Sequence, residues 1–335
     1  MRLRRERSRL VVGVAGLALG ALTLSGCGGK QENAGTEGAG SCDAGTGRIT
    51  IATGNATGVY YPLGGGLAQV ISKNTKVKAS AAETGASVQN IQQLVAGDYD
   101  VAFSLADTAA DAVGGKGDFE GKKADVKALA RLYLNYTHVV VRADSGIESM
   151  EDMKGKVVST GSPQSGTEVI AGRLLESAGL DPDNDIKPQR LDLTKTVDGM
   201  KDGRIDALVW SGGLPTPAIT DVFQSLGDKV KFIDISPLLG DMQQVNEVYA
   251  DGTIPADTYK TPEDVPTIVV PNLLLVNSDM PENRACALTK VMFDHKADLE
   301  KVHPAATDIT LTDGPTTEPV QLHPGAQQAY DKLGG

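Results

Sequence analysis

The chain has 335 residues, of which 40% are hydrophobic and only 4% aromatic, and its formal net charge is −11. This acidic balance argues against nucleic acid as a partner, because the phosphate backbone binds basic surfaces. The four histidines are scattered, with no i,i+4 pair and no nearby cysteine, so the sequence predicts no metal site and no cofactor.

The first residues have the composition of an export signal. Five arginines between Arg2 and Arg9 precede an apolar run that ends at Leu24, which is too short for a confident spanning helix. Leu24-Ser-Gly-Cys27 is similar to the bacterial lipobox, in which the cysteine is lipidated. We therefore expect a lipoprotein signal peptide over residues 1–26, lipidation of Cys27, and an extracytoplasmic protein attached to the cell membrane by its lipid. An ordinary signal peptide or anchor is the alternative, and both Sec and twin-arginine export stay open.

Residues 27–47 are interpreted as a flexible tether, because they hold too little apolar surface to offset the entropy of ordering them. Residues 1–26 contain five Arg and one Glu, so the chain without them has a net charge of −15. The remaining body exceeds one ordinary domain, and two lobes are expected. Two thiols outside the cytoplasm usually pair, so we expect a Cys42–Cys286 disulfide, with unpaired thiols as the alternative.

Apolar runs bounded by turns alternate with helical patterns along the body. The pattern predicts strands at 48–53, 77–83, 100–104, 129–134, 138–142, 157–160, 207–210 and 267–276, and helices near 59–73, 86–97 and 166–178. This alternation favours an α/β fold with largely parallel sheets. Pro271 lacks a ladder donor, so its strand is expected to be kinked or at an edge, and residues 251–264 are expected to form a loop.

Segments 138–142 and 265–276 are interpreted as two crossings between lobes. Two crossings would make residues 143–266 an insertion, called lobe II, into a lobe I built from residues 48–142 and 267–335. Hinge closure over a cleft between the lobes then follows naturally.

Four segments carry small or polar residues between a strand and a helix, namely 53–60, 83–87, 104–107 and 160–167. Ligands of parallel α/β sheets bind outside the carboxyl ends of the strands, so these segments are expected to converge on one cleft. Each signal alone is weak, because Ser and Thr before a helix are usually N-caps and Gly usually serves a turn. The shared chemistry is N–H and hydroxyl donation next to helix N-termini, which suits a small anion. The candidate ligand-binding residues are Thr53, Gly54, Thr57, Gly58, Tyr60, Thr84, Ser87, Ser104, Asp107, Ser162, Ser165, Gly166, Thr167, Trp210 and Gly213.

Trp210 is the only tryptophan, and the sequence leaves open whether it covers a ligand or anchors a core. Signals for catalysis fail on inspection. The glycines of residues 115–121 match neither G-x-G-x-x-G nor a P-loop, and Ser165 is not part of a G-x-S-x-G elbow. No nucleophile and base pair can be assembled, so no catalytic residues are expected.

Eight segments carry a family resemblance: Ala52-Thr-Gly-Asn-Ala-Thr-Gly-Val-Tyr-Tyr-Pro62, Glu83-Thr-Gly-Ala-Ser87, Arg142-Ala-Asp-Ser-Gly-Ile147, Lys154-Gly-Lys-Val157, Ser165-Gly-Thr-Glu168, Gly203-Arg-Ile-Asp-Ala207, Gly213-Leu-Pro-Thr-Pro-Ala218 and His323-Pro-Gly-Ala326. Together and in this order, they resemble the TAXI family of solute-binding subunits of TRAP transporters. The resemblance implies a two-lobed type II periplasmic-binding-protein fold with its ligand cleft between the lobes. It also implies capture of an organic anion or amino acid, with a lean towards glutamate-like and other carboxylates, and delivery to a TRAP membrane permease.

The sequence therefore supports a lipid-anchored binding protein that closes two lobes over a small carboxylate without catalysis. Three rivals stay open. They are a binding subunit of an ABC importer, an exported hydrolase or transferase, and a structural surface antigen that shows no ligand-induced closure.

Overall fold

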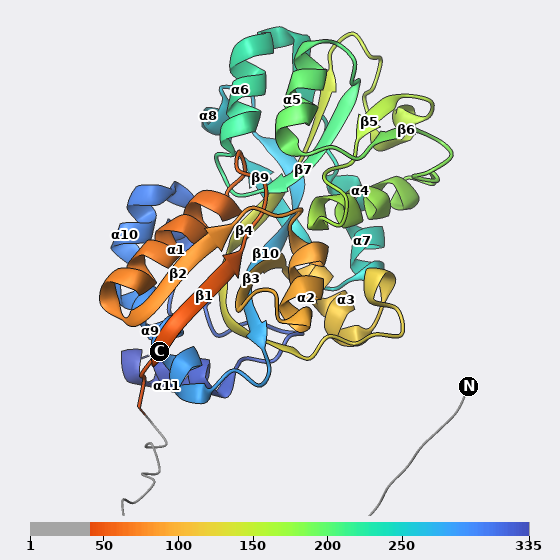
Figure 1. Ribbon diagram of the computed structural model, residues 1–335. Helices are drawn as coiled ribbons and strands as arrows, with labels where there is room; N and C mark the ends of the chain where they lie inside the picture. Colours follow the sequence, from red (N-terminus) through yellow and green to blue (C-terminus); the bar gives the residue numbers. More distant parts are fainter. Residues whose placement is uncertain (1–40, 335) are drawn as a thin grey trace, which may run out of the picture. The chain divides into compact units, whose positions relative to one another are not determined.

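The computed structural model describes residues 41–334 (Figure 1). The predicted signal peptide 1–26, the lipidation site Cys27 and most of the predicted tether lie outside the described residues. Within residues 41–334, no helix combines the length and the apolar character needed to cross a membrane.

One sheet of ten strands runs through the described residues in the order β2-β1-β3-β10-β4-β7-β5-β6, with β8 beside β4 and β9 beside β10. The strands are β1 (Thr46–Ala52), β2 (Lys76–Ala82), β3 (Val101–Leu105), β4 (Val126–Arg142), β5 (Val157–Ser159), β6 (Lys187–Gln189), β7 (Ala207–Gly212), β8 (Val230–Phe232), β9 (Ala250–Ile254) and β10 (Val265–Asn277).

Helices pack against both ends of this sheet path, with α1 beside β2 and α4 and α5 beside β7 (Figure 1). The α-helices are α1 (Tyr60–Asn74), α2 (Ser87–Ala96), α3 (Ala106–Gly114), α4 (Gly166–Ser177), α5 (Leu193–Lys201), α6 (Pro217–Leu226), α7 (Leu239–Val245), α8 (Ala256–Tyr259), α9 (Glu282–Asp294), α10 (Lys296–Val302) and α11 (Pro324–Leu333). Short 3₁₀ turns are η1 (Gly117–Phe119), η2 (Met150–Met153), η3 (Gly227–Lys229), η4 (Ser236–Leu238) and η5 (Pro304–Asp308).

Strands β4 and β10 form the centre of the sheet, which corrects one expectation and, of the two alternatives given for the Pro271 strand, excludes the edge. The two strands expected at 129–134 and 138–142 are one strand, because the polar residues Asn135 and Thr137 that suggested a break are buried inside it. The strand that contains Pro271 is central, not an edge, since β10 pairs with β3, β4 and β9. Its register against β4 shifts between Pro271 and Leu273, and this irregularity accommodates the missing donor.

The direction of pairing also differs in part from the expectation. Strand β1 runs parallel to β2 and β3, and β5 runs parallel to β6 and β7, as the alternating pattern predicted. Each named strand pair that involves β4 or β10 is antiparallel. The sheet is therefore mixed, because β10 returns along β4 in the opposite direction.

Residues 251–264 were expected to form a loop, and this expectation is wrong. They contain most of β9, which pairs with β10, followed by the short helix α8. In β9 only Ile254 is buried, so the segment lacks the apolar alternation that marks a strand in a sequence. Gly252 allows the close approach to β10, because a Cβ there would lie 2.2 Å from a methyl carbon of Val269.

The apolar core falls into three clusters that match a two-lobed α/β fold. One cluster joins α1 and α9 to β1 and the early part of β4, and another joins α5 and α6 to β7 and β8. The third contains Leu105 and Ala106 of the β3–α3 junction together with Ile170 and Leu174 of α4. Apolar contacts therefore continue from the β1–β3 end of the sheet path to the β5–β7 end.

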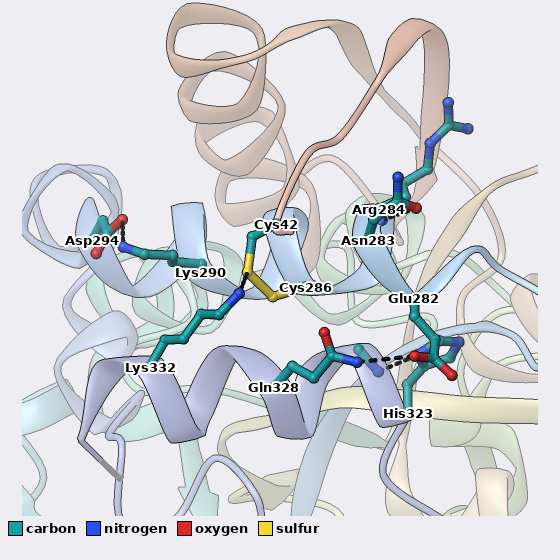
Figure 2. The surroundings of a disulfide bond; sticks show 11 residues. Cys42, Glu282, Asn283, Arg284, Cys286, Lys290, Asp294, His323, Gln328 and Lys332 are labelled. Carbon is teal, nitrogen blue, oxygen red and sulfur yellow. Dashed lines mark hydrogen bonds and ion pairs between the residues drawn. A yellow bond between two sulfur atoms is a disulfide. The ribbon is translucent and has the colours of Figure 1, made fainter. Parts of the chain in front are cut away.

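The expected disulfide is confirmed. Cys42 is bonded to Cys286 on α9 across a sequence separation of 244, with the two Cα atoms 4.9 Å apart (Figure 2). Close by, the Arg284 side chain donates hydrogen bonds to the carbonyl oxygens of Ala44 and Thr46, each at 3.1 Å. The predicted tether thus ends earlier than residue 47, since Thr46 already belongs to β1.

His138 on β4 is fully buried in an aromatic and polar setting. Its Nδ1 lies 2.8 Å from the Tyr136 carbonyl oxygen, which can only accept, so the ring proton resides on Nδ1. Nε2 then accepts a hydrogen bond of 2.8 Å from the Tyr259 hydroxyl, which itself accepts the Thr216 N–H. Burial lowers the pKa of His138 from 6.5 to about 4.

This buried neutral imidazole is expected to make the fold sensitive to mild acid. Because the unfolded chain takes up a proton near pH 6.5 and the folded chain only near pH 4, His138 stabilises the fold above pH 6.5, and this contribution is lost as the pH falls towards 4. The full effect is about 3 kcal/mol in the free energy of unfolding. Urea unfolding of wild type and His138→Gln between pH 7.5 and pH 4 should show a flatter pH dependence for the variant. Identical pH dependences would contradict the prediction.

Candidate functional site

One cavity brings together the loop before α1, the first residues of α2 and α4, and parts of β3, β4 and β7. The free volume inside it is small, about 30 Å³, so its walls lie close together in this structure. The lining residues are Gly54, Asn55, Gly58, Val59, Tyr60, Gly85, Ala86, Ser87, Leu105, Tyr133, Asn135, Ser165, Gly166, Thr167, Trp210, Ser211 and Gly212. Eight of the candidates named from the sequence are among them: Gly54, Gly58, Tyr60, Ser87, Ser165, Gly166, Thr167 and Trp210.

Three helix N-termini meet at this cavity, because α1 begins at Tyr60, α2 at Ser87 and α4 at Gly166. The backbone N–H groups of these residues and of Thr167 have no hydrogen-bond partner among residues 41–334. First-turn N–H groups have no acceptor within their own helix, and the helix dipole adds positive potential at that end. The arrangement is suited to a negatively charged or hydrogen-bond-accepting group.

Three side-chain hydroxyls in the lining accept hydrogen bonds from main-chain amides. Ser165 caps α4 by accepting the Glu168 N–H at 3.0 Å, and Thr167 accepts the Ser211 N–H at 3.2 Å. Ser87 accepts the Leu105 N–H at 3.0 Å. A hydroxyl that accepts in this way keeps its own O–H to donate. The lining therefore offers donors more than acceptors.

Two further hydroxyls in the lining are buried without a partner. The Tyr133 hydroxyl on β4 and the Ser211 hydroxyl on β7 make no hydrogen bond with any residue of the range 41–334, although the two residues are only 1% and 4% exposed. Burial raises the pKa of Tyr133 well above 10, so its hydroxyl stays protonated. An unpaired buried hydroxyl costs about 1–3 kcal/mol, which a bound ligand would offset.

The floor of the cavity is fixed by an amide network that joins β4 to β10. The Tyr60 hydroxyl donates to Oδ1 of Asn272, whose Nδ2 donates to the Tyr133 carbonyl oxygen at 2.9 Å and to Oδ1 of Asn135 at 2.8 Å. Burial raises the pKa of Tyr60 far above its ordinary value, so this hydroxyl also remains neutral. Tyr60, Tyr133 and Asn135 are therefore held in place before any ligand binds.

Trp210 lines the cavity with its ring. Its Nε1 donates to the Thr216 hydroxyl at 3.1 Å, which fixes the plane of the indole. Gly58 lies directly against this ring, because a Cβ at Gly58 would be 3.1 Å from Cζ2 of Trp210. The loop before α1 and the end of β7 therefore meet at Trp210.

Other candidates from the sequence lie outside the lining, and their hydroxyls bond within the protein. Thr53 donates to the Ala82 carbonyl oxygen at 2.6 Å and Thr84 to Oδ1 of Asn90 at 2.6 Å. Ser104 donates to the carbonyl oxygen of Leu105 at 3.0 Å. Thr53 thus links the end of β1 to the end of β2, Thr84 bonds to α2, and Ser104 bonds within β3.

Two more candidates outside the lining make contacts between segments far apart in the chain. The Thr57 hydroxyl lies 3.2 Å from that of Thr194 at the start of α5, and Ser162 donates to Oδ1 of Asn55 at 3.1 Å. Gly213 packs on the ring of Tyr133, where a Cβ would lie 2.8 Å from Cε2.

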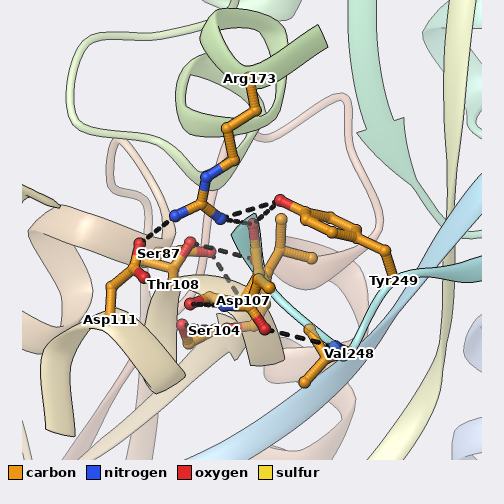
Figure 3. A network of polar contacts seen from close by, with 10 residues as sticks. Ser87, Ser104, Asp107, Thr108, Asp111, Arg173, Val248 and Tyr249 are labelled. Atoms are coloured by element: carbon orange, nitrogen blue, oxygen red, sulfur yellow. Dashed lines mark hydrogen bonds and ion pairs between the residues drawn. The ribbon is translucent and has the colours of Figure 1, made fainter. Parts of the chain in front are cut away.

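Asp107 has a different environment from the one expected for a ligand-binding residue. Its carboxylate is completely buried and accepts from Nη1 of Arg173 on α4 at 3.0 Å and from the Tyr249 hydroxyl at 2.5 Å (Figure 3). The same guanidinium also pairs with Asp111, whose pKa is raised by burial despite the nearby Arg173. Asp107 is therefore part of an ion-pair network that joins α3 to α4.

The sequence did not point to Tyr133, Asn135, Ser211 or Gly212 as site residues. Asn135 and Tyr133 reach the cavity because the centre of β4 passes beneath it. The one available signal was the polar stretch Asn-Tyr-Thr inside an otherwise apolar run. Among the described residues, no group of three or more His, Cys, Asp or Glu side chains is arranged to hold a metal ion.

Solved structures with the same architecture are known. A protein from Bordetella bronchiseptica RB50 is 17% identical, with a TM-score of 0.57 over 86% of this chain and 98% of that one. A binding protein component of an ABC phosphonate transporter from Pseudomonas aeruginosa is 14% identical, with a TM-score of 0.51 over 79% and 81%. At these identities the likeness shows the fold, which is the two-lobed type II periplasmic-binding-protein fold. The sequence matches the NMT1-like family over residues 51–334, and the chain belongs to that family.

Proposed function

We propose that this protein is an extracytoplasmic solute-binding lipoprotein that captures a small organic anion and delivers it to the membrane subunit of a TRAP transporter. The observation that carries the proposal is the convergence on one cavity of three helix N-termini and two buried hydroxyls that have no partner within residues 41–334. Membership of the NMT1-like family and the type II fold support it. The TAXI resemblance of the eight segments above is the reason to prefer a TRAP partner.

In this proposal lobe I comprises residues 48–142 and 267–335, and lobe II comprises residues 143–266. A ligand held by the N-termini of α1 and α2 in lobe I is then covered by the N-terminus of α4 and by Trp210 in lobe II. Closure adds contacts that only the bound form makes, so ligand binding shifts the population towards the closed state. The mechanism needs binding and release, and no residue acts as a nucleophile or base.

The second candidate is a binding subunit of an ABC importer, supported by the Pseudomonas aeruginosa neighbour, which is a binding protein component of an ABC phosphonate transporter. The same two-lobed body suits both systems. The adjacent reading frame distinguishes them, since a TRAP system encodes a many-helix permease and an ABC system encodes an ATPase.

A thermal-shift screen tests the binding proposal. The purified full chain is heated with glutamate, glutamine, 2-oxoglutarate, C4-dicarboxylates, monocarboxylates such as pyruvate, 2-oxoisovalerate and butyrate, and inorganic anions, and a compound that binds only the folded state raises the melting temperature. We expect a rise with at least one carboxylate, and unchanged ligand after incubation. Turnover of the ligand would contradict the proposal. So would the absence of any shift together with no small molecule released on denaturation, as measured by mass spectrometry.

A further inference from the structure

We infer that the ligand is an organic anion with a single negative charge and no ammonium group. This inference rests on the proposed function of the cavity and names its substrate class. It follows from the charges and hydrogen-bonding capacities of the lining residues.

Among residues 41–334, the cavity lining contains no Asp, Glu, Lys, Arg or His. Its two tyrosines are kept neutral by burial. A charged group on the ligand must therefore be stabilised by dipoles and hydrogen bonds alone, in a site largely removed from water. Burying an ionised group without such partners costs far more than burying a neutral one.

A negatively charged group on the ligand can accept hydrogen bonds from several N–H and O–H groups of the lining. The unbonded N–H groups of Tyr60, Ser87 and Gly166 each stand at the positive end of a helix of ten or more residues. The buried hydroxyls of Tyr133 and Ser211, unpartnered within residues 41–334, are an independent sign that a polar ligand completes the site. One carboxylate fits this set of donors. A second carboxylate would have to be buried beside the first without a cation, at the cost of mutual repulsion.

A positively charged group on the ligand would meet fewer free hydrogen-bond acceptors in the lining than a negatively charged group meets donors. An ammonium group needs acceptors, and the two side-chain amide oxygens of the lining already accept from the protein. Oδ1 of Asn55 accepts from the Ser162 hydroxyl at 3.1 Å and from the Leu193 N–H at 3.2 Å. Oδ1 of Asn135 accepts from Asn272 at 2.8 Å. With no carboxylate in the lining, an α-amino acid would leave its ammonium poorly compensated, whereas a 2-oxo or 2-hydroxy acid of the same shape would not.

Matched ligand pairs test the inference by isothermal titration with the full chain. The pairs are pyruvate with L-alanine, 2-oxoisovalerate with L-valine, and butyrate with succinate. We expect the monoanion of at least one pair to bind, and to bind at least tenfold more tightly than its zwitterionic or dianionic counterpart. An amino acid or dicarboxylate that binds as tightly as its partner would overturn the inference and leave the proposed function intact. If no compound binds and denaturation releases no small molecule, both fail.

A second test measures how much the Tyr133 hydroxyl contributes to ligand binding. Tyr133→Phe removes the unpartnered oxygen and keeps the ring that packs against Gly213. We expect this variant to be as stable as wild type or more so, and to bind the best monoanion about tenfold more weakly. Equal affinity would overturn the assignment of the Tyr133 hydroxyl to the ligand. Tyr330→Phe is the control, because its hydroxyl bonds to the Leu129 carbonyl oxygen away from the cavity.

Discussion

Gly166→Val is expected to weaken ligand binding at least about fivefold while the ligand-free protein remains folded. Gly166 is the first residue of α4, and a Cβ there would lie 2.5 Å from Cδ1 of Leu105 and 2.8 Å from Oγ of Ser87. Both neighbours belong to β3 and α2, at the other end of the sheet path. The clash therefore destabilises the arrangement in which α4 contacts β3 and α2, and it disappears when α4 moves away from them. Overpacking of this kind costs about 1–3 kcal/mol, which corresponds to roughly five- to 150-fold in affinity.

Gly172→Val provides the matched control for this substitution. Gly172 lies in the same helix, and nothing lies within 4 Å of a Cβ built there. Titration with the best carboxylate of the screen should give near wild-type affinity for this control. Small-angle scattering should show a ligand-induced decrease in the radius of gyration for wild type and Gly172→Val only. Wild-type affinity and compaction in Gly166→Val would show that close contact at α4 is not needed for binding.

Arg173→Met is expected to lower the free energy of unfolding by about 3–5 kcal/mol, because it leaves a buried carboxylate without its cation. Asp107 is completely buried and the Arg173 side chain is only 11% exposed, so water cannot replace the lost partner. The Tyr249 hydroxyl would remain as a neutral donor to Asp107. Urea unfolding at pH 7 measures the effect.

Two further variants distinguish the loss of stability caused by breaking the buried ion pair from the loss caused by removing any arginine. Arg204→Met breaks an ion pair with Asp202 whose side chains are 67% and 58% exposed, and such pairs contribute less than about 1 kcal/mol. The double variant Arg173→Met with Asp107→Asn should recover part of the lost stability, because the charge of Asp107 is then gone and only Asp111 is left without its cation. An Arg173→Met protein within 1 kcal/mol of wild type would contradict the proposed importance of this network.

Much of the fold could be predicted because local sequence controls it. The segment from Ile49 to Ala68 predicted a strand, a polar turn and a helix start, and the structure has β1, that turn and α1. The same logic found Ser87, Ser165 and Gly166 in the cavity lining. Backbone donors at helix starts follow from short-range patterns, and short-range patterns are visible in one sequence.

The parts that could not be predicted depend on partners distant in the chain. Asp107 resembled a ligand-binding residue because it follows a strand, but its partners Arg173 and Tyr249 are 66 and 142 residues away. Likewise, Asn135 resembles a turn residue in the sequence, but in the structure it accepts a hydrogen bond from Asn272 of β10, which is 137 residues away. A polar side chain looks the same in the sequence whether it binds a ligand or bonds inside the core.

The bond between Cys42 and Cys286 also has a mechanical consequence. Any pull on the chain ahead of Cys42 enters the folded body at two points, β1 through the backbone and α9 through the covalent crosslink. Without the crosslink the load would fall on hydrogen bonds only, those of β1 and those from Arg284, and β1 could be peeled from β2 and β3 one residue at a time. The crosslink shares the tension with a helix from the other end of the sequence, so β1 and the cavity loop that follows it are shielded from traction on the N-terminal segment.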